Sequence, residues 1–131
     1  MKYELLKPTC NLQTVFDGRG GIFTWVPQDP ILEYNLIYFT PGAIRGNHFH
    51  PEFTEYFLVV DGTGIMVFKT PDGKEETMHM AKGSCTRAEP GVAHAFHAIT
   101  PVTAISMLSK PWDLCHPPIV HEFVTSEDNK T

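Results

Sequence analysis

The sequence lacks any run of basic residues and any long hydrophobic segment. Its ten lysine and arginine residues are scattered from Lys2 to Lys130, and the formal net charge of the 131-residue chain is −5. Because nucleic-acid-binding proteins concentrate positive charge on one face or stripe, this distribution argues against a nucleic-acid partner. No apolar segment is long enough for a signal peptide or a transmembrane helix. We therefore expect a cytoplasmic protein without a membrane partner.

Cysteine is also scarce, and several common catalytic motifs are absent. The three cysteines, Cys10, Cys85 and Cys115, are widely spaced and form no Cys-x-x-Cys pair. An odd number at this spacing indicates reduced thiols of a cytosolic protein. The sequence contains no Ser-His-Asp set, no glycine-rich phosphate loop and no dinucleotide-binding fingerprint.

Amphipathic helices are the third absence. Ten glycines and eleven prolines divide the chain into short apolar segments, a spacing typical of many short strands. An Asp-Gly turn at residues 72–73 indicates a hairpin. We expect strands at residues 12–16, 22–26, 33–40, 47–50, 55–61, 65–70, 75–80, 84–88, 102–109 and 119–124, with one more around His94.

The strand pattern predicts an all-β protein. Short strands without helices fit a jelly-roll barrel, a double sheet that is closed or nearly closed. We expect a hairpin around the turn at residues 17–21, a strand 102–109 buried on both sides, and a last strand at a sheet edge. No repeat or linker divides the chain, so we expect one domain at residues 1–124 and a flexible tail at residues 125–131.

The segment from Gly42 to Gly62 carries the strongest functional signal. His48 and His50 lie two residues apart, so on a strand their side chains project from the same face. Pro51 favours a bend, after which Glu55 begins the next strand and can face the same interior. Two imidazoles and a carboxylate that converge are suitable ligands for a divalent metal, and His94 is the candidate for a fourth.

These residues resemble the two cupin motifs. Gly42, His48, His50, Glu55 and Gly62 fill every fixed place of the first motif, and Gly83, Gly91 and His94 match the second. Pro90 is one position late in the second motif, and Ala98 replaces its asparagine. The resemblance implies a double-stranded β-helix, the cupin barrel, with one divalent metal held by His48, His50, Glu55 and His94. One barrel hosts many chemistries, so the motifs alone do not define the reaction.

A narrower resemblance concerns two shorter segments. Residues 45–50, Arg-Gly-Asn-His-Phe-His, and residues 17–22, Asp-Gly-Arg-Gly-Gly-Ile, are similar to segments of sugar-nucleotide cupins. These cupins include dTDP-keto-sugar 3,4-ketoisomerases, dTDP-sugar 3,5-epimerases and the cupin half of capsule-sugar reductase/epimerases. In the metal-free ketoisomerases the residues matching His48 and His50 act as acid and base. The complete ligand set here favours the metal-containing branch, with zinc as the expected ion and iron, manganese or nickel as alternatives.

Other residues are candidates for substrate binding or proton transfer. Arg45 and Arg19 either bind an anionic group of the substrate or form surface ion pairs. Tyr38 either donates a proton, lines the pocket or packs in the core. Phe57 and Phe96 are in phase with Glu55 and His94, so we expect them to face the interior, whereas the opposite parity points Tyr56 outward. For His97, as for His79, His116 and His121, we expect structural roles away from the metal.

The function expected from these residues is a metal-dependent epimerisation or ketoisomerisation of a sugar or sugar nucleotide. Such a reaction moves a proton next to a carbonyl, catalysed by His48, His50 and Tyr38, on an anionic small-molecule substrate. An Fe(II)-dependent dioxygenase and a non-catalytic sugar-binding module are the alternatives. The cupin resemblance also implies a homodimer that pairs through its N-terminal strands.

Overall fold

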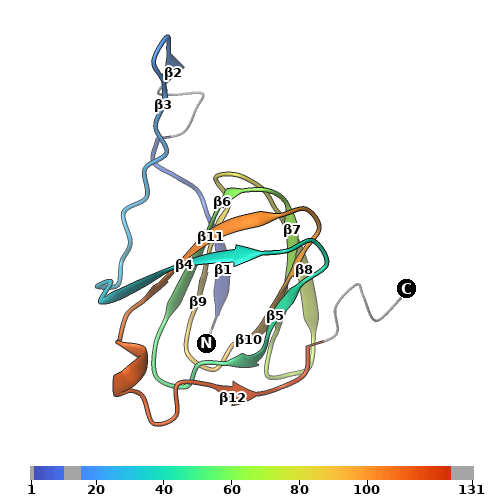
Figure 1. Ribbon diagram of the computed structural model, residues 1–131. Coiled ribbons are helices and arrows are strands. Elements are labelled where there is room, and N and C mark those ends of the chain that lie inside the picture. The colour runs from blue at the N-terminus through green and yellow to red at the C-terminus, as the bar shows by residue number, and fades with distance from the viewer. Residues whose placement is uncertain (1, 11–15, 125–131) are drawn as a thin grey trace.

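The computed structural model describes residues 2–10 and 16–124 of the chain, which form two antiparallel sheets facing each other (Figure 1). One sheet has the strand order β1-β9-β6-β11-β4 and the other the order β12-β5-β10-β7-β8. A separate two-stranded ribbon, β2-β3, projects away from the barrel (Figure 1). This arrangement is the double-sheet barrel that the sequence predicts.

The strands are short, and a 3-10 helix lies late in the chain. Their bounds are β1 Tyr3–Leu6, β2 Phe16–Asp17, β3 Gly20–Gly21, β4 Glu33–Phe39, β5 Ile44–Phe49, β6 Glu55–Asp61, β7 Gly64–Lys69, β8 Glu75–Met80, β9 Cys85–Ala88, β10 Ala93–Ala98, β11 Val102–Leu108, η1 Trp112–Leu114 and β12 Val120–His121. The strands predicted at 55–61 and 75–80 are confirmed to the residue, and β12 is an edge strand as expected.

Two expectations about strands were wrong, and one strand was not predicted. Residues 22–26 form no strand, because Thr24 only bridges Cys10 while the segment crosses the outside of the first sheet. β1 was not anticipated, although it pairs with β9 along four residues. β11 is not buried on both sides, since only its alternate residues are fully buried. Of the predicted strand 12–16, only Phe16 lies within the described residues. The predicted tail at 125–131 lies wholly outside them.

The space between the sheets holds the main hydrophobic core. Alternate residues of facing strands supply it, as expected where each strand turns one face inward. The central side chains are the aromatic and aliphatic residues Phe39, Phe57, Val59, Met66, Phe68 and Phe96, each at most 6% exposed. The rings of Phe39, Phe57 and Phe96 contact one another at centroid distances of 4.9–6.3 Å. They fill one part of the barrel and leave the other end to polar residues.

A buried arginine holds the segment before β4 against the outer face of the first sheet. Arg87, on β9, is 5% exposed, and its Nε donates to Asp29 Oδ2 at 2.8 Å. The hydroxyl of Tyr56 donates to the same oxygen at 2.6 Å. Tyr56 therefore points away from the barrel interior, as expected, but the segment carrying Asp29 covers it and leaves it only 3% exposed. This contact sets the position at which the chain enters β4.

No helix among residues 2–10 and 16–124 is long and apolar enough to span a membrane.

The Asp29–Arg87 pair predicts a pH-dependent loss of stability on the acidic side. Hydrogen bonding from Arg87 holds the pKa of Asp29 below its ordinary 3.8. A depressed pKa adds stability above the ordinary range of the carboxyl, and this stability is lost as the pH falls through the folded-state pKa. After a discount for partial exposure, we expect Asp29→Asn to lower the unfolding free energy by about 1 kcal/mol at neutral pH. Denaturant unfolding of both forms measures this difference. A difference that persists well below pH 3 would contradict the assignment.

Candidate active site and metal centre

A cavity of about 660 Å³ opens between the two sheets. Its walls come from the inward residues of β4, β5, β6, β7, β10 and β11, together with Trp112 and Asp113 of η1. Part of its lining is the aromatic core, and another part is a polar cluster of His48, His50, Glu55, His94 and Ser106. A cavity of this size with a few convergent polar groups is typical of a small-molecule site.

A bulge in β5 aims the first two histidines into this cavity. His48 pairs with His94, but Gly46 pairs with the next residue of β10, so Asn47 is an extra residue in β5. Asn47 has a φ of 57° and Gly46 a φ of 119°. A Cβ on Gly46 would lie 2.6 Å from the carbonyl oxygen of His94, so the backbones can approach only if this residue is glycine.

The chain after β12 holds this bulge in place. The backbone carbonyl of Asn47 accepts a hydrogen bond from the Glu122 amide at 3.0 Å, and its side-chain oxygen accepts one from the Val124 amide at 2.9 Å. Asparagine tolerates the left-handed conformation that the bulge requires and supplies an acceptor as well. The orientation of His48 therefore depends on residues near the C-terminal end of the described chain.

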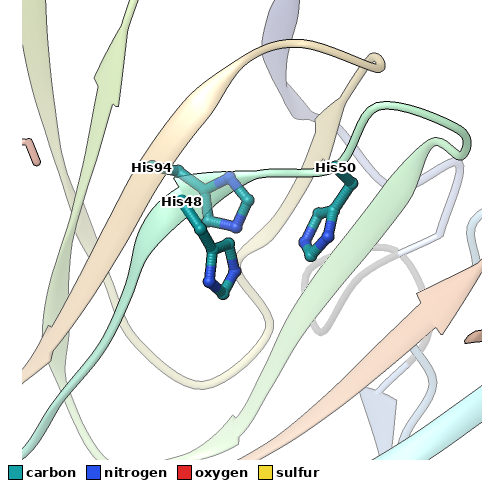
Figure 2. A group of neighbouring side chains, drawn as sticks. All are labelled: His48, His50 and His94. Carbon is teal, nitrogen blue, oxygen red and sulfur yellow. The ribbon is translucent and has the colours of Figure 1, made fainter. Parts of the chain in front are cut away.

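The three imidazoles converge on one point (Figure 2). The ring centroids of His48, His50 and His94 lie 4.7–5.1 Å apart, and one ring nitrogen from each lies within 4.8 Å of the others. Glu55 reaches the same point from β6. Its Oε1 lies 3.3 Å from His50 Nε2 and 3.2 Å from His94 Nε2.

Backbone carbonyls fix the orientation of two of these rings. Nδ1 of His50 lies 3.1 Å from the carbonyl oxygen of Pro118, and Nδ1 of His94 lies 3.1 Å from that of Val92. A carbonyl can only accept, so each Nδ1 carries the proton and each Nε2 of the neutral ring offers a lone pair to the cavity. Ser106 donates to Glu55 Oε2 at 2.7 Å and so fixes the carboxylate.

The charges in this cluster favour an ionised carboxylate. Burial alone would raise the pKa of Glu55, but its contacts with His50 and His94 hold the pKa well below the ordinary 4.5. Burial lowers the pKa of His94, and the contact with Glu55 outweighs it, so that the pKa is raised. Burial and the neighbouring imidazoles lower the pKa of His48 to about 4.

The residues fit a divalent metal. His50 Nε2 is buried and forms no hydrogen bond within the described part of the chain, although Glu55 Oε1 is near. Two imidazole lone pairs that face one carboxylate repel it unless a positive charge, a proton or a cation, lies among them. Imidazole nitrogens and one carboxylate oxygen are common ligands of zinc or iron. In such sites the Nδ1–H group of each histidine usually donates a hydrogen bond that fixes the orientation of the ring.

Three of the residues predicted to bind substrate lie at the cavity. Phe57 and Phe96 form its apolar wall, and Arg45 lies at its rim. The guanidinium of Arg45 lies 5.8 Å from the centre of the Phe39 ring and forms no ion pair with any described residue. An exposed, unpaired guanidinium at the mouth of a cavity is available to an anion.

The structure does not bring Tyr38 and Arg19 to the cavity. Ile37 and Phe39 turn inward from β4, so Tyr38 between them points to the outer face and is 68% exposed. Arg19 lies in the projecting β2–β3 ribbon, where it pairs with Asp17 at 2.6 Å. The prediction of Tyr38 as a proton donor was therefore wrong on the parity of its strand, and Arg19 cannot reach the cavity of its own chain.

Two further cavity residues were missed or left unplaced from the sequence. Ser106 is the one polar residue in the inward series Val102, Ala104, Ser106 and Leu108 of β11, and this break in an apolar alternation was a usable signal. Trp112 has no comparable signal. Its amide donates to Glu33 Oε1 at 2.9 Å, and its ring lies 6.1 Å from that of His50.

Comparisons with known proteins agree with this description. Residues 15–113 match the family model described as the polysaccharide biosynthesis C-terminal domain. A 3,4-ketoisomerase from Helicobacter canadensis superposes with a TM-score of 0.78 at 15% identity, covering 98% of this chain and 94% of that one. The sugar 3,4-ketoisomerase QdtA from Thermoanaerobacterium thermosaccharolyticum, solved with TDP, gives 0.74 at 15% identity and covers 92% and 88%. No curated protein sequence matches the chain.

A longer protein also contains this fold. The capsular polysaccharide assembling protein CapF from Staphylococcus aureus superposes with a TM-score of 0.66 at 23% identity over 94% of this chain. The matched region is 34% of CapF, so this chain corresponds to about a third of that protein.

The jelly-roll barrel and the histidine–glutamate cluster inside it define a cupin. Within that class, the match over about three quarters of its length shows that the chain belongs to the polysaccharide biosynthesis C-terminal domain family.

The Ser106–Glu55 hydrogen bond predicts an effect on metal affinity. If the cluster binds zinc, Ser106→Ala should weaken that binding by roughly 10-fold or more, because a freed carboxylate must be reordered on binding. Ser106→Thr, which keeps the hydroxyl, serves as the matched control. Titration with a chelating competitor measures the affinity, and thermal melting of both metal-free variants checks the fold. Equal affinity in the alanine variant and the native chain would contradict this role for Ser106.

Proposed function

We propose that this protein is a metal-dependent epimerase or ketoisomerase that acts on a sugar or sugar nucleotide by proton transfer next to a carbonyl. The observation that carries the proposal is the cluster of His48, His50, His94 and Glu55 in a cavity with the unpaired Arg45 at its rim. The resemblance of the fold to a 3,4-ketoisomerase and to a sugar 3,4-ketoisomerase solved with TDP supports it.

Of the four residues predicted to bind the metal, His50, His94 and Glu55 would hold the ion, and His48 would instead transfer the proton. Zinc is favoured over iron, manganese or nickel. Their contacts with Pro118, Val92 and Ser106 orient the donor atoms before any ion arrives. Bound there, a divalent metal supplies Lewis acidity that stabilises negative charge on the substrate carbonyl oxygen.

His48 would carry the proton. Its ring faces the cavity and has no hydrogen bond or ion pair to another described residue, in contrast to His50 and His94. A ring nitrogen of His48 can therefore accept the proton from the substrate carbon and return it. With Tyr38 on the outer face, no tyrosine among the described residues lines the cavity as an alternative.

Arg45 and the aromatic wall would position the substrate. The guanidinium suits a phosphate or carboxylate group at the mouth, where it binds in bidentate fashion. Phe57 and Phe96 would pack against the uncharged part of the substrate, since both rings are buried and line the cavity.

The first test is metal content together with deuterium exchange. Protein purified without a chelator or an affinity tag is analysed by elemental mass spectrometry and then incubated with keto-sugar nucleotides in deuterated buffer. We expect about one zinc per chain and deuterium at the carbon next to the carbonyl. Iron with oxygen consumption would instead favour a dioxygenase, and ligand-induced stabilisation without exchange would favour a binding module.

Replacement of His48 separates proton transfer from metal binding. We expect His48→Asn to retain the metal and to lower kcat by roughly 100-fold or more, as loss of a general base does. His79→Asn, an exposed histidine of β8 far from the cluster in sequence, is the control and should leave both quantities unchanged. Loss of the metal in the His48 variant would show that this ring is a fourth ligand and not the base.

Arg45→Gln should mainly affect substrate affinity. We expect KM for an anionic substrate to rise roughly 10-fold or more with little change in kcat, because the guanidinium contacts a group remote from the reacting carbon. Arg19→Gln is the comparison, since Arg19 lies outside the cavity of its own chain. A fall in kcat at unchanged KM for Arg45→Gln would contradict the binding role.

A further inference from the structure

The inward residues of β4 change character along the strand. Glu33 and Asn35 are polar, whereas Ile37 and Phe39 are apolar, and all four line the cavity. Because a strand rises about 3.3 Å per residue, the Cα atoms of Glu33 and Phe39 lie roughly 20 Å apart. The guanidinium of Arg45 lies beside Phe39, 5.8 Å from the centre of its ring. The cavity therefore has a basic end at Arg45 and a separate polar end at Glu33.

The polar end is the one that contains the histidine–glutamate cluster. Leu108 of β11 pairs with Glu33 of one neighbouring strand and with Glu55 of the other. Since neighbouring strands lie about 4.8 Å apart, the Cα atoms of Glu33 and Glu55 are separated by roughly 10 Å across the sheet. The ring of Trp112 lies 6.1 Å from that of His50, whose buried Nε2 forms no hydrogen bond within the described part of the chain. Glu33 and Trp112 thus border the same part of the cavity as the cluster.

Hydrogen bonds hold Glu33 and Trp112 in place. Oε1 of Glu33 accepts a hydrogen bond from the backbone amide of Trp112 at 2.9 Å, and Oε2 accepts one from Nδ2 of Asn35 at 3.0 Å. Each of these oxygens can accept a further hydrogen bond. Lys110, two residues before Trp112, pairs with Glu52 at 2.6 Å and so fixes the same segment. Side chains that are fixed before a ligand arrives lose little entropy when it binds.

The two ends of the cavity carry opposite charges. Among the described residues that line it, Arg45 is the only lysine or arginine, whereas Glu33 and Asp113 lie at the other end. A phosphate group suits the guanidinium of Arg45. Near Glu33 a hydroxyl group can donate a hydrogen bond, while a second carboxylate would meet a like charge. The indole of Trp112 offers an apolar face to the carbon atoms of a sugar ring.

We propose that Glu33 and Trp112 form the subsite for the sugar ring, and that Glu33 selects a sugar with a hydroxyl group over one with a carboxylate. This subsite rests on the proposed function, which places the phosphate groups of a sugar nucleotide at Arg45. The substituent at C5 of a hexose then points towards Glu33, because it lies at the end of the ring remote from the C1 phosphate. A hydroxymethyl group in that position donates a hydrogen bond to Glu33, and the carboxylate of a uronic acid is repelled.

Equilibrium binding of two sugar nucleotides tests the subsite. UDP-glucose and UDP-glucuronate differ only at C6, which is a hydroxymethyl group in one and a carboxylate in the other, and neither has the keto group needed for turnover. We expect the full native chain to bind UDP-glucose roughly 10-fold or more tightly than UDP-glucuronate. Glu33→Gln should remove most of this preference, because it deletes the like charge and keeps an acceptor for the Trp112 amide. Isothermal titration calorimetry measures the affinities, and thermal melting checks the fold of the variant.

Arg45→Gln is the matched control. It should weaken the binding of both sugar nucleotides by a similar factor and leave their ratio unchanged, since both contain the same diphosphate. A native chain that binds the two equally, prefers UDP-glucuronate or binds neither would overturn the proposal, even if the variant does not fold. So would a folded Glu33→Gln variant that keeps the native preference.

The failure of this subsite can be distinguished from the failure of the proposed function. Deuterium exchange into a keto-sugar nucleotide, together with equal binding of the two UDP-sugars, would remove the subsite and leave the isomerase. A preference for UDP-glucose that depends on Glu33, without any exchange, would keep the subsite and remove the isomerase.

Discussion

The ionised carboxylate of Glu55, buried between the two sheets, is the constraint on which the site depends. A charge in that position is costly unless it is surrounded by compensating groups. The hydroxyl of Ser106 donates a hydrogen bond to one oxygen of Glu55, and the Nε2 atoms of His50 and His94 lie close to the other. Those two rings are fixed in turn by backbone carbonyls on two different loops. The barrel therefore places a carboxylate where its surroundings would suit a cation. The other polar residues described above, His50, His94 and Ser106, are arranged around this carboxylate.

Much of this arrangement could be predicted from the sequence because it depends on short-range geometry. The two-residue spacing of His48 and His50, the bend at Pro51 and the start of β6 at Glu55 all follow from strand periodicity and proline chemistry. The same periodicity placed Phe57 and Phe96 inside and Tyr56 outside. Applied to β4, strand periodicity also places Tyr38 on the face opposite to Ile37 and Phe39. The wrong prediction of Tyr38 as a proton donor could therefore have been avoided.

The remaining features depend on contacts between distant parts of the chain. The segment at residues 22–26 has the composition of a strand, but Asp29 is bonded to Arg87, 58 residues later, and the segment crosses the sheet instead of joining it. β1 is recognisable only through its pairing with β9. The bulge at Asn47 likewise requires knowledge of how closely β10 approaches Gly46. Local propensity contains no information on such pairings, which explains why these elements were missed while the motifs were found.

The support of His48 and His50 by the end of the chain has a consequence for the order of events during synthesis on the ribosome. The carbonyl that orients His50 is 68 residues downstream, and the amide that anchors the bulge at Asn47 is 77 residues downstream. The histidines of the first motif thus leave the ribosome long before the groups that hold them. A metal ion that meets the nascent chain finds imidazoles that still rotate freely. Only when residues 118–124 have been added does the barrel hold these side chains rigidly, so the site takes shape well after its first two histidines have been synthesised.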